Sequence, residues 1–243
     1  MRLSLIQMVI LSAIVLAFSL SADDTDYAAE RAALVEEVRS YAVRDPGTDE
    51  SLFGGKVMQA MAAVKRHEFV PEYLKAEAYE NHPLPIGYGQ TISQPYIVAL
   101  MTGLVDPGPD DVVLEVGTGS GYQAAVLAKL VRQVYSMEII EPLAKQVEER
   151  LERLEYGNVE TKLGDGYYGW EEHAPFDAIV VTAAASHVPP PLIQQLKPGG
   201  RLVIPVGGRF MVQSLLLIEK TEDGEVLTRQ ITAVRFVPLT GDH

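Results

Sequence analysis

Residues 112–122 decide the fold and read VVLEVGTGSGY. A strand-like run, Val112–Val116, leads directly into glycines at alternating positions, Gly117, Gly119 and Gly121. Because glycine has no Cβ, the chain can turn tightly there and a ligand can approach the backbone amides. A strand that ends in such a loop and continues as a helix is typical of the ligand-binding edge of a doubly wound α/β sheet.

The residues after this stretch repeat the order of strand, turn and helix. Short apolar runs predict four more strands, at Val134–Glu138, Val159–Leu163, Phe176–Thr182 and Arg201–Val206. Helical spacing of apolar residues predicts helices between them, at Gly121–Val131, Pro142–Leu154 and Pro189–Leu196. This alternation predicts a Rossmann-like, mostly parallel sheet with helices on both faces. The last β-rich segments predict a C-terminal antiparallel hairpin, at Gln213–Ile218 and Leu227–Phe236.

The N-terminal part of the chain has a helical pattern instead. Apolar spacing predicts an amphipathic helix over Asp26–Val43, with a shared face made by Ala33, Leu34, Val38 and Tyr41. A second helix is expected over Val57–Arg66, and a Pro- and Gly-rich loop over His82–Gly89. We expect a helical region, residues 23–109, to form one compact domain with an α/β core of residues 110–243.

Residues 1–22 have the layout of a secretory signal peptide. Arg2 precedes an apolar run from Leu5 to Leu20, and Asp23 and Asp24 follow. The run is slightly short for a membrane span of roughly 20 residues, so either a cleavable export signal or a membrane anchor is expected. A misplaced start codon and an ordinary buried helix are the alternatives.

The composition excludes several functional classes. The chain has 20 Lys+Arg against 33 Asp+Glu, a formal net charge of -13, so general nucleic-acid binding is not expected. It has no Cys, which removes disulfides, thiolate zinc sites and a cysteine nucleophile. His67 and His187 have no second ligand at metal spacing, so no metal site is expected.

Acidic residues follow the next two strands. Glu138 ends the second strand, where a carboxylate can accept hydrogen bonds from both hydroxyls of a ribose. Asp165 and Gly166 follow the third strand, where the carboxylate can bond the exocyclic amine of adenine. Tyr122 stands where the dinucleotide fingerprint requires Gly or Ala, which argues against a pyrophosphate clamp. These features indicate a pocket for a nucleoside without phosphates, and S-adenosylmethionine is the common cofactor of that shape. The alternative is that they are only turn formers and a surface carboxylate.

Six segments carry a family resemblance. Three resemble motifs of the class I S-adenosylmethionine-dependent methyltransferases: Glu115–Ala125, Phe176–Ala185 and Leu196–Gly207. Three others resemble protein-L-isoaspartate O-methyltransferases more narrowly: Arg66–Pro71, Pro85–Pro95 and Phe236–Gly241. The GQTISQP sequence of residues 89–95 lies outside the generic cofactor fold, so it distinguishes this family from other methyltransferases.

The resemblance implies methyl transfer to the free α-carboxylate of L-isoaspartyl residues in damaged proteins and peptides, which starts repair through a succinimide. It implies that Ser93 is the catalytic residue and orients that carboxylate; the alternative is that Ser93 only caps the next helix. No general base is required, because a carboxylate with a pKa of about 4 is ionised at neutral pH. The expected cofactor-binding residues are Thr91, Ile92, Glu115, Gly117, Gly119, Gly121, Glu138, Asp165 and Gly166.

Other readings share part of these features. A methyltransferase for another carboxylate or a small molecule would share only the cofactor half, and an exported, non-catalytic peptide-binding domain would share the fold. The family is mainly cytosolic, whereas residues 1–22 indicate export to the periplasm or the membrane. We expect a monomer that contacts a membrane, if at all, only through residues 5–20. Ser186 stands where the family more often has Pro, which leaves the peptide preference open.

Overall fold

The computed structural model describes residues 27–44, 49–209 and 211–241. The export signal or anchor expected in residues 1–22 lies outside the described residues. Within those three ranges, every helix is too short or too polar to cross a membrane.

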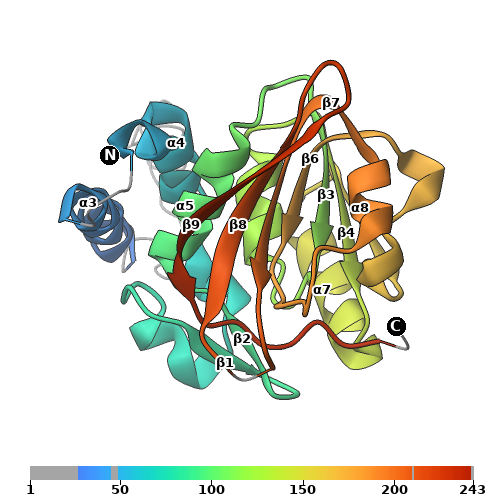
Figure 1. Ribbon diagram of the computed structural model, residues 1–243. Coiled ribbons are helices and arrows are strands. Elements are labelled where there is room, and N and C mark those ends of the chain that lie inside the picture. The colour runs from blue at the N-terminus through green and yellow to red at the C-terminus, as the bar shows by residue number, and fades with distance from the viewer. Residues whose placement is uncertain (1–26, 45–48, 210, 242–243) are drawn as a thin grey trace, which may run out of the picture.

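A central sheet with the strand order β5-β4-β3-β6-β7-β8-β9 organises the molecule (Figure 1). Its strands are β3 (Val112–Val116), β4 (Gln133–Glu138), β5 (Val159–Leu163), β6 (Phe176–Val181), β7 (Leu196–Val206), β8 (Gln213–Lys220) and β9 (Val226–Val234). The first five run parallel, and β8 and β9 add the antiparallel hairpin. The order reverses between β3 and β6, which confirms the predicted doubly wound fold with its ligand-binding edge after β3.

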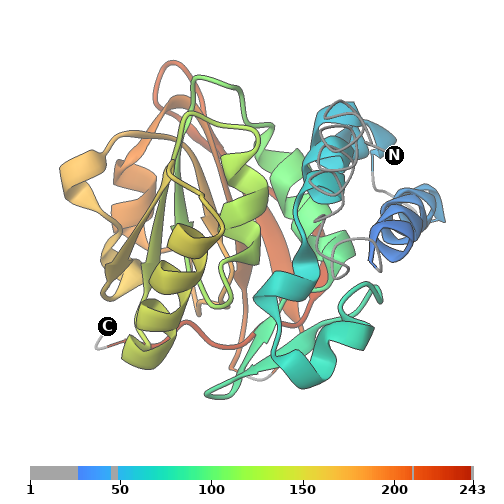
Figure 2. The same cartoon turned by 180° about the vertical axis from the view of Figure 1, so that it is seen from behind.

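Helices cover both faces of the sheet because its strands are apolar on both sides (Figure 2). Val113 packs into one core cluster with residues of α5 (Pro95–Val105), α6 (Tyr122–Ala128) and α7 (Glu141–Arg153). The next residue, Leu114, packs into a second cluster with α8 (Pro190–Gln194). Alternation along the strands therefore divides the core into two layers.

The N-terminal region packs against the α5 side of the sheet. It contains α3 (Ala28–Arg44), η1 (Glu50–Phe53), α4 (Gly55–Ala63), η2 (Arg66–Phe69) and η3 (Glu72–Glu77). The buried stripe of α3 is Leu34, Val38 and Ala42. The predicted face is therefore wrong at Ala33 and Tyr41, which are exposed, because the helix buries only a narrow stripe of residues four apart.

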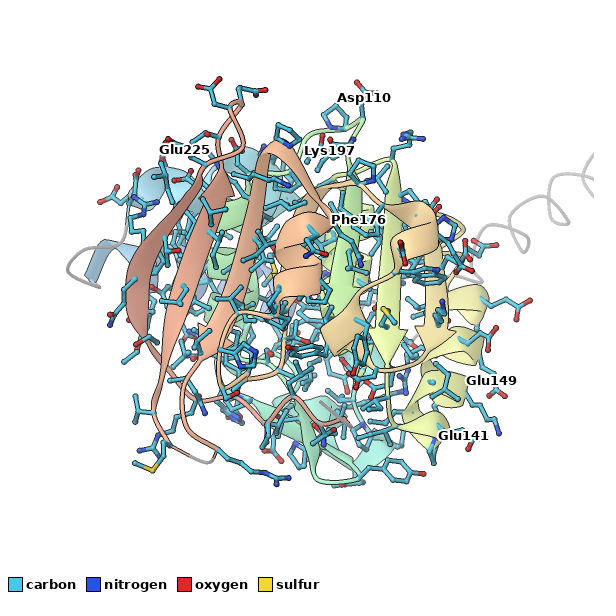
Figure 3. All side chains as sticks on the ribbon, turned by 45° about the vertical axis from the view of Figure 1, so that its right-hand side comes forward. Asp110, Glu141, Glu149, Phe176, Lys197 and Glu225 are labelled. Carbon is cyan, nitrogen blue, oxygen red and sulfur yellow. The ribbon has the colours of Figure 1, made fainter. Side chains whose placement is uncertain are left out.

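The loop expected over His82–Gly89 is wrong in part, because it forms a hairpin. β1 (Leu84–Gly87) pairs with β2 (Gln90–Ile92), and the tip residues Gly87, Tyr88 and Gly89 have φ angles of 92°, 53° and 73°. The hairpin lies at the carboxyl ends of the parallel strands (Figure 1). Asp110, Lys197 and Glu225 mark the opposite end of the sheet, as Figure 3 shows.

Candidate active site

One cavity at the carboxyl ends of the strands brings together most of the predicted site residues. Those that line it are Thr91, Ile92, Ser93, Glu115, Gly117, Gly119, Glu138 and Gly166. Gly121 and Asp165 are outside this lining. Gly121 instead faces α7, where a Cβ would lie 2.5 Å from Cγ2 of Val147, so helix packing requires the glycine.

The loop after β3 depends on glycine for its shape. Gly117 has a φ of 96°, and a Cβ there would lie 2.6 Å from Oγ1 of Thr182. The Thr182 hydroxyl donates to the Gly117 carbonyl oxygen at 2.6 Å, so the loop is tied to the end of β6. A side chain at residue 117 would break this contact and enter the cavity wall.

Glu138 holds the same loop from the β4 side. Its Oε2 accepts a hydrogen bond from the Gly119 amide at 2.8 Å, and its Oε1 accepts one from the Ile140 amide at 2.9 Å. The side chain is 6% exposed and lines the cavity. Each carboxylate oxygen retains a second acceptor position, so the bonds predicted to ribose hydroxyls remain available.

Glu115 is wholly buried and bonds a side chain of the neighbouring strand. Ser136, opposite it on β4, donates to Oε2, and Ser136 also bonds Thr118 at 2.7 Å. Its other oxygen, Oε1, has no partner among the described residues. Burial raises the pKa of Glu115 to about 8, so at neutral pH the carboxyl is protonated. The carboxylate that bonds the Gly119 amide is that of Glu138, whereas Glu115 contacts the loop through Ser136, which bonds Thr118.

The turn after β5 places glycine, not the aspartate side chain, against the cavity. A Cβ on Gly166 would overlap Cγ1 of Val116, so only glycine fits there. Asp165 Oδ1 accepts from the Tyr167 amide at 2.9 Å and caps η4 (Gly166–Tyr168). Its contact with adenine stays a prediction. Trp170, which follows this turn, is buried and packs at the ring edge of Tyr135.

Ser93 lies between the hairpin and α5, and it does not cap that helix. The N-cap is Gln94, which makes no side-chain capping bond, and the Tyr96 amide donates instead to Oδ1 of Asn81 at 3.0 Å. The capping alternative for Ser93 is therefore wrong. The Ser93 hydroxyl has no hydrogen-bond partner among the residues that the structure describes, which leaves it available to a ligand.

A second cavity adjoins the first at this point. Ser93, Thr91 and Thr182 line both. Its other walls come from the hairpin, from α5 and from the segment after β9, including Pro83, Ile97, Arg235 and Phe236. The shared residues separate a cavity over the strand ends from a second one that can admit another molecule.

Several residues that line the first cavity were not predicted as site residues from the sequence. Thr182, Gln123 and the segment Val237–Thr240 line the first cavity; Thr182 follows β6 and Gln123 belongs to α6. All of them fall inside quoted family motifs, which were the available signal. Gln123 comes two residues after Gly121, and no spacing rule distinguishes it from a packing residue.

His67 and His187 make polar contacts with neighbouring side chains. His67 is buried with its Nδ1 2.7 Å from the Tyr79 hydroxyl, and burial lowers its pKa. His187 lies between the Tyr167 hydroxyl and Ser186. No group of three or more potential metal ligands occurs in the described ranges.

The donor set of the first cavity fits S-adenosylmethionine. No Lys or Arg of the described chain lines it, which suits a nucleoside without phosphates. A buried acceptor of its lining, Gln123 Oε1, has no partner among the described residues. Unpartnered acceptors call for a donor-bearing ligand, and the cofactor carries an ammonium group and two ribose hydroxyls.

Sequence comparison gives consistent matches. Residues 40–243 match the family described as Protein-L-isoaspartate(D-aspartate) O-methyltransferase (PCMT). Protein-L-isoaspartate O-methyltransferase 1 of Cupriavidus necator is 60% identical over 238 residues, covering 97% of this chain and 92% of that protein. Protein-L-isoaspartate O-methyltransferase 2 of a Polaromonas species is 64% identical over 214 residues, covering 88% of this chain and 99% of that protein.

Two solved structures share the fold. One named protein-L-isoaspartate O-methyltransferase has a TM-score of 0.77 at 29% identity, over 87% of this chain and 66% of that chain. The other is a Plasmodium falciparum protein provisionally given the same name, in complex with S-adenosyl-L-homocysteine. It has a TM-score of 0.71 at 26% identity, over 86% of this chain and 98% of that chain.

Proposed function

Because this chain belongs to the protein-L-isoaspartate(D-aspartate) O-methyltransferase family, we propose that it methylates the free α-carboxylate of L-isoaspartyl residues in damaged proteins and peptides, with Ser93 orienting that carboxylate. S-adenosylmethionine, when bound, supplies an electrophilic methyl group that the carboxylate oxygen takes up as a methyl ester. The observation that carries the role of Ser93 is its position on both cavities, where the methyl donor and the acceptor must meet.

The residues at this junction have to position the acceptor, not to remove a proton from it. An ionised carboxylate is already a nucleophile, and Ser93 and Thr91 can each donate a hydroxyl hydrogen bond to it. Ser93 is half-buried, so its hydroxyl reaches both cavities without being fully solvated. Orientation of the two reacting groups then supplies most of the rate acceleration.

Apolar side chains line part of the cavity near the junction. Ile92 and Val98 are buried apolar residues of the lining, and Val237 and Leu239 close it from the C-terminal segment. A water-poor site strengthens the interactions that the carboxylate makes and suppresses competing solvation of the nucleophile.

The activity is tested with the full chain, labelled S-adenosylmethionine and two peptides that differ only in L-isoaspartate or L-aspartate at one position. We expect base-labile methyl ester on the isoaspartyl peptide alone. Equal label on both peptides, or none, would contradict the substrate assignment.

The role of Ser93 is tested with Ser93→Ala. Loss of one hydrogen bond to a charged acceptor is expected to lower kcat by about 10-fold or more, with the dissociation constant of S-adenosylhomocysteine within about twofold of wild type. Ser40→Ala, an exposed position on α3, is the matched control and should leave both values unchanged. An unchanged kcat in Ser93→Ala would remove Ser93 from the mechanism.

A further inference from the structure

Gln123 is a buried polar side chain that the mechanism above does not use. It is 6% exposed, lines the first cavity, and its Oε1 has no partner among the residues that the structure describes. Buried side-chain oxygens are nearly always hydrogen-bonded in folded proteins. A ligand in the cavity is therefore expected to supply the missing donor to the Gln123 carbonyl.

The orientation of the Gln123 amide follows from its neighbour on α5. The Thr102 hydroxyl donates its only proton to the Val98 carbonyl oxygen at 2.7 Å, so Thr102 Oγ1 can only accept from Gln123. Gln123 Nε2 donates to it at 2.9 Å, and Thr102 is fully buried. The NH₂ group is thus committed to α5, and the carbonyl is the part of the amide left for the cavity.

This amide belongs to the end of the cavity nearest Ser93. Val98, whose carbonyl anchors Thr102, lines the cavity one turn into α5, and Ser93 comes just before that helix. Glu138 ends β4 and Gly166 follows β5, and the nucleoside is expected against these two residues. Gln123 therefore lies at the end where the methyl-donor sulfur and the groups beyond it have to be.

The chemistry at that end selects one group of the cofactor. Gln123 Oε1 is an unpartnered acceptor, because the amide nitrogen of the same side chain is bonded to Thr102. Beyond its sulfur, the cofactor carries an ammonium group, which can only donate, and a carboxylate, which can only accept. The ammonium is the group that this carbonyl oxygen can bind.

We propose that the Gln123 carbonyl accepts a hydrogen bond from the ammonium group of the methionyl tail of the cofactor. The residue then selects ligands with the complete tail over nucleosides that lack it. This inference rests on the cofactor assignment and not on the isoaspartyl substrate, so failure of the peptide assay would leave it standing.

The test compares two ligands by isothermal titration calorimetry of the full chain. S-adenosylhomocysteine has the tail, whereas methylthioadenosine has the same nucleoside and sulfur without it. In Gln123→Met, which keeps the length but loses the acceptor, S-adenosylhomocysteine should bind about 10-fold more weakly or worse, and methylthioadenosine within about twofold of wild type. Gln123→Leu gives the same comparison if the methionine variant does not fold.

Two further variants separate this contact from a packing effect. Gln123→Glu in its protonated form can donate to Thr102 and keep a carbonyl oxygen, so it should restore S-adenosylhomocysteine binding to within about threefold of wild type. Gln195→Met removes another buried amide, whose oxygen and nitrogen bond the Trp170 amide and the Tyr168 carbonyl at 2.8 Å each, and it should affect both ligands alike. Unchanged S-adenosylhomocysteine affinity in Gln123→Met, or an equal loss for both ligands, would overturn the proposal.

Discussion

Glu138→Gln should weaken cofactor binding by an amount that the geometry sets. The carboxylate accepts from the amides of Gly119 and Ile140 at 2.8 and 2.9 Å, whereas a glutamine of the same shape offers one oxygen and turns an NH₂ group toward the other amide. A lost hydrogen bond to a charged group is worth about 1.5–3 kcal/mol, and about 1.4 kcal/mol corresponds to a factor of ten. If ligand binding requires this loop conformation, the dissociation constant of S-adenosylhomocysteine rises about 10- to 150-fold.

The assay is calorimetric titration with S-adenosylhomocysteine, with thermal unfolding as a check that the variant is folded. Glu149→Gln is the matched control, because Glu149 lies on the solvent side of α7 (Figure 3) and its loss of charge should leave the affinity unchanged. An affinity for Glu138→Gln within about twofold of wild type would refute the reasoning that this carboxylate shapes the glycine loop.

Three further outcomes are expected. The pKa of Glu115 in the folded chain, about 8, lies above the ordinary glutamate value of 4.5, so the wild type should lose unfolding free energy as pH rises between these values, by at most about 1.4 kcal/mol per pH unit. Glu115→Gln, which resembles the protonated form, should flatten this dependence in urea titrations at several pH values; an equal slope would show that Glu115 is ionised in the fold. Gly166→Ala should weaken S-adenosylhomocysteine and methylthioadenosine together, because its Cβ would overlap Val116, and Gly166→Ala with Val116→Ala should recover part of the affinity. For residues 1–22 we expect export, so N-terminal sequencing of the chain from the periplasmic fraction of a Gram-negative host should begin near residue 23; an intact cytosolic chain would contradict it.

The sheet could be predicted from sequence where local signals agree. The bounds of β3 and β5 match the predicted Val112–Val116 and Val159–Leu163, because short β-favouring runs there are bounded by turn residues. β7 begins at Leu196, five residues before the predicted Arg201, since Leu196 pairs with Phe176 across an irregularity in the ladder. Such pairing depends on a partner strand that the sequence pattern does not show.

Two features could not be predicted because the local residue types are compatible with two structures. The first turn of α5 is capped by Asn81, fifteen residues before Tyr96, and this non-local hydrogen bond replaces the cap that Ser93 was expected to supply. The hairpin of β1 and β2 is local, but its Pro and Gly residues usually indicate an irregular loop.

The glutamates of β3 and β4 are the same residue type but have different roles in the cavity. Glu115 lies within β3, Glu138 ends β4, and both line the same cavity, but their residue type does not predict that their protonation states differ. The difference comes from the donors around each one. Glu138 ends its strand where two backbone amides converge on it, whereas the parallel register places the Ser136 hydroxyl opposite Glu115. Burial outweighs the hydrogen bonds to Glu115, so Glu115 holds a proton at neutral pH, and the cavity combines a carboxylate that shapes the loop with a neutral carboxyl.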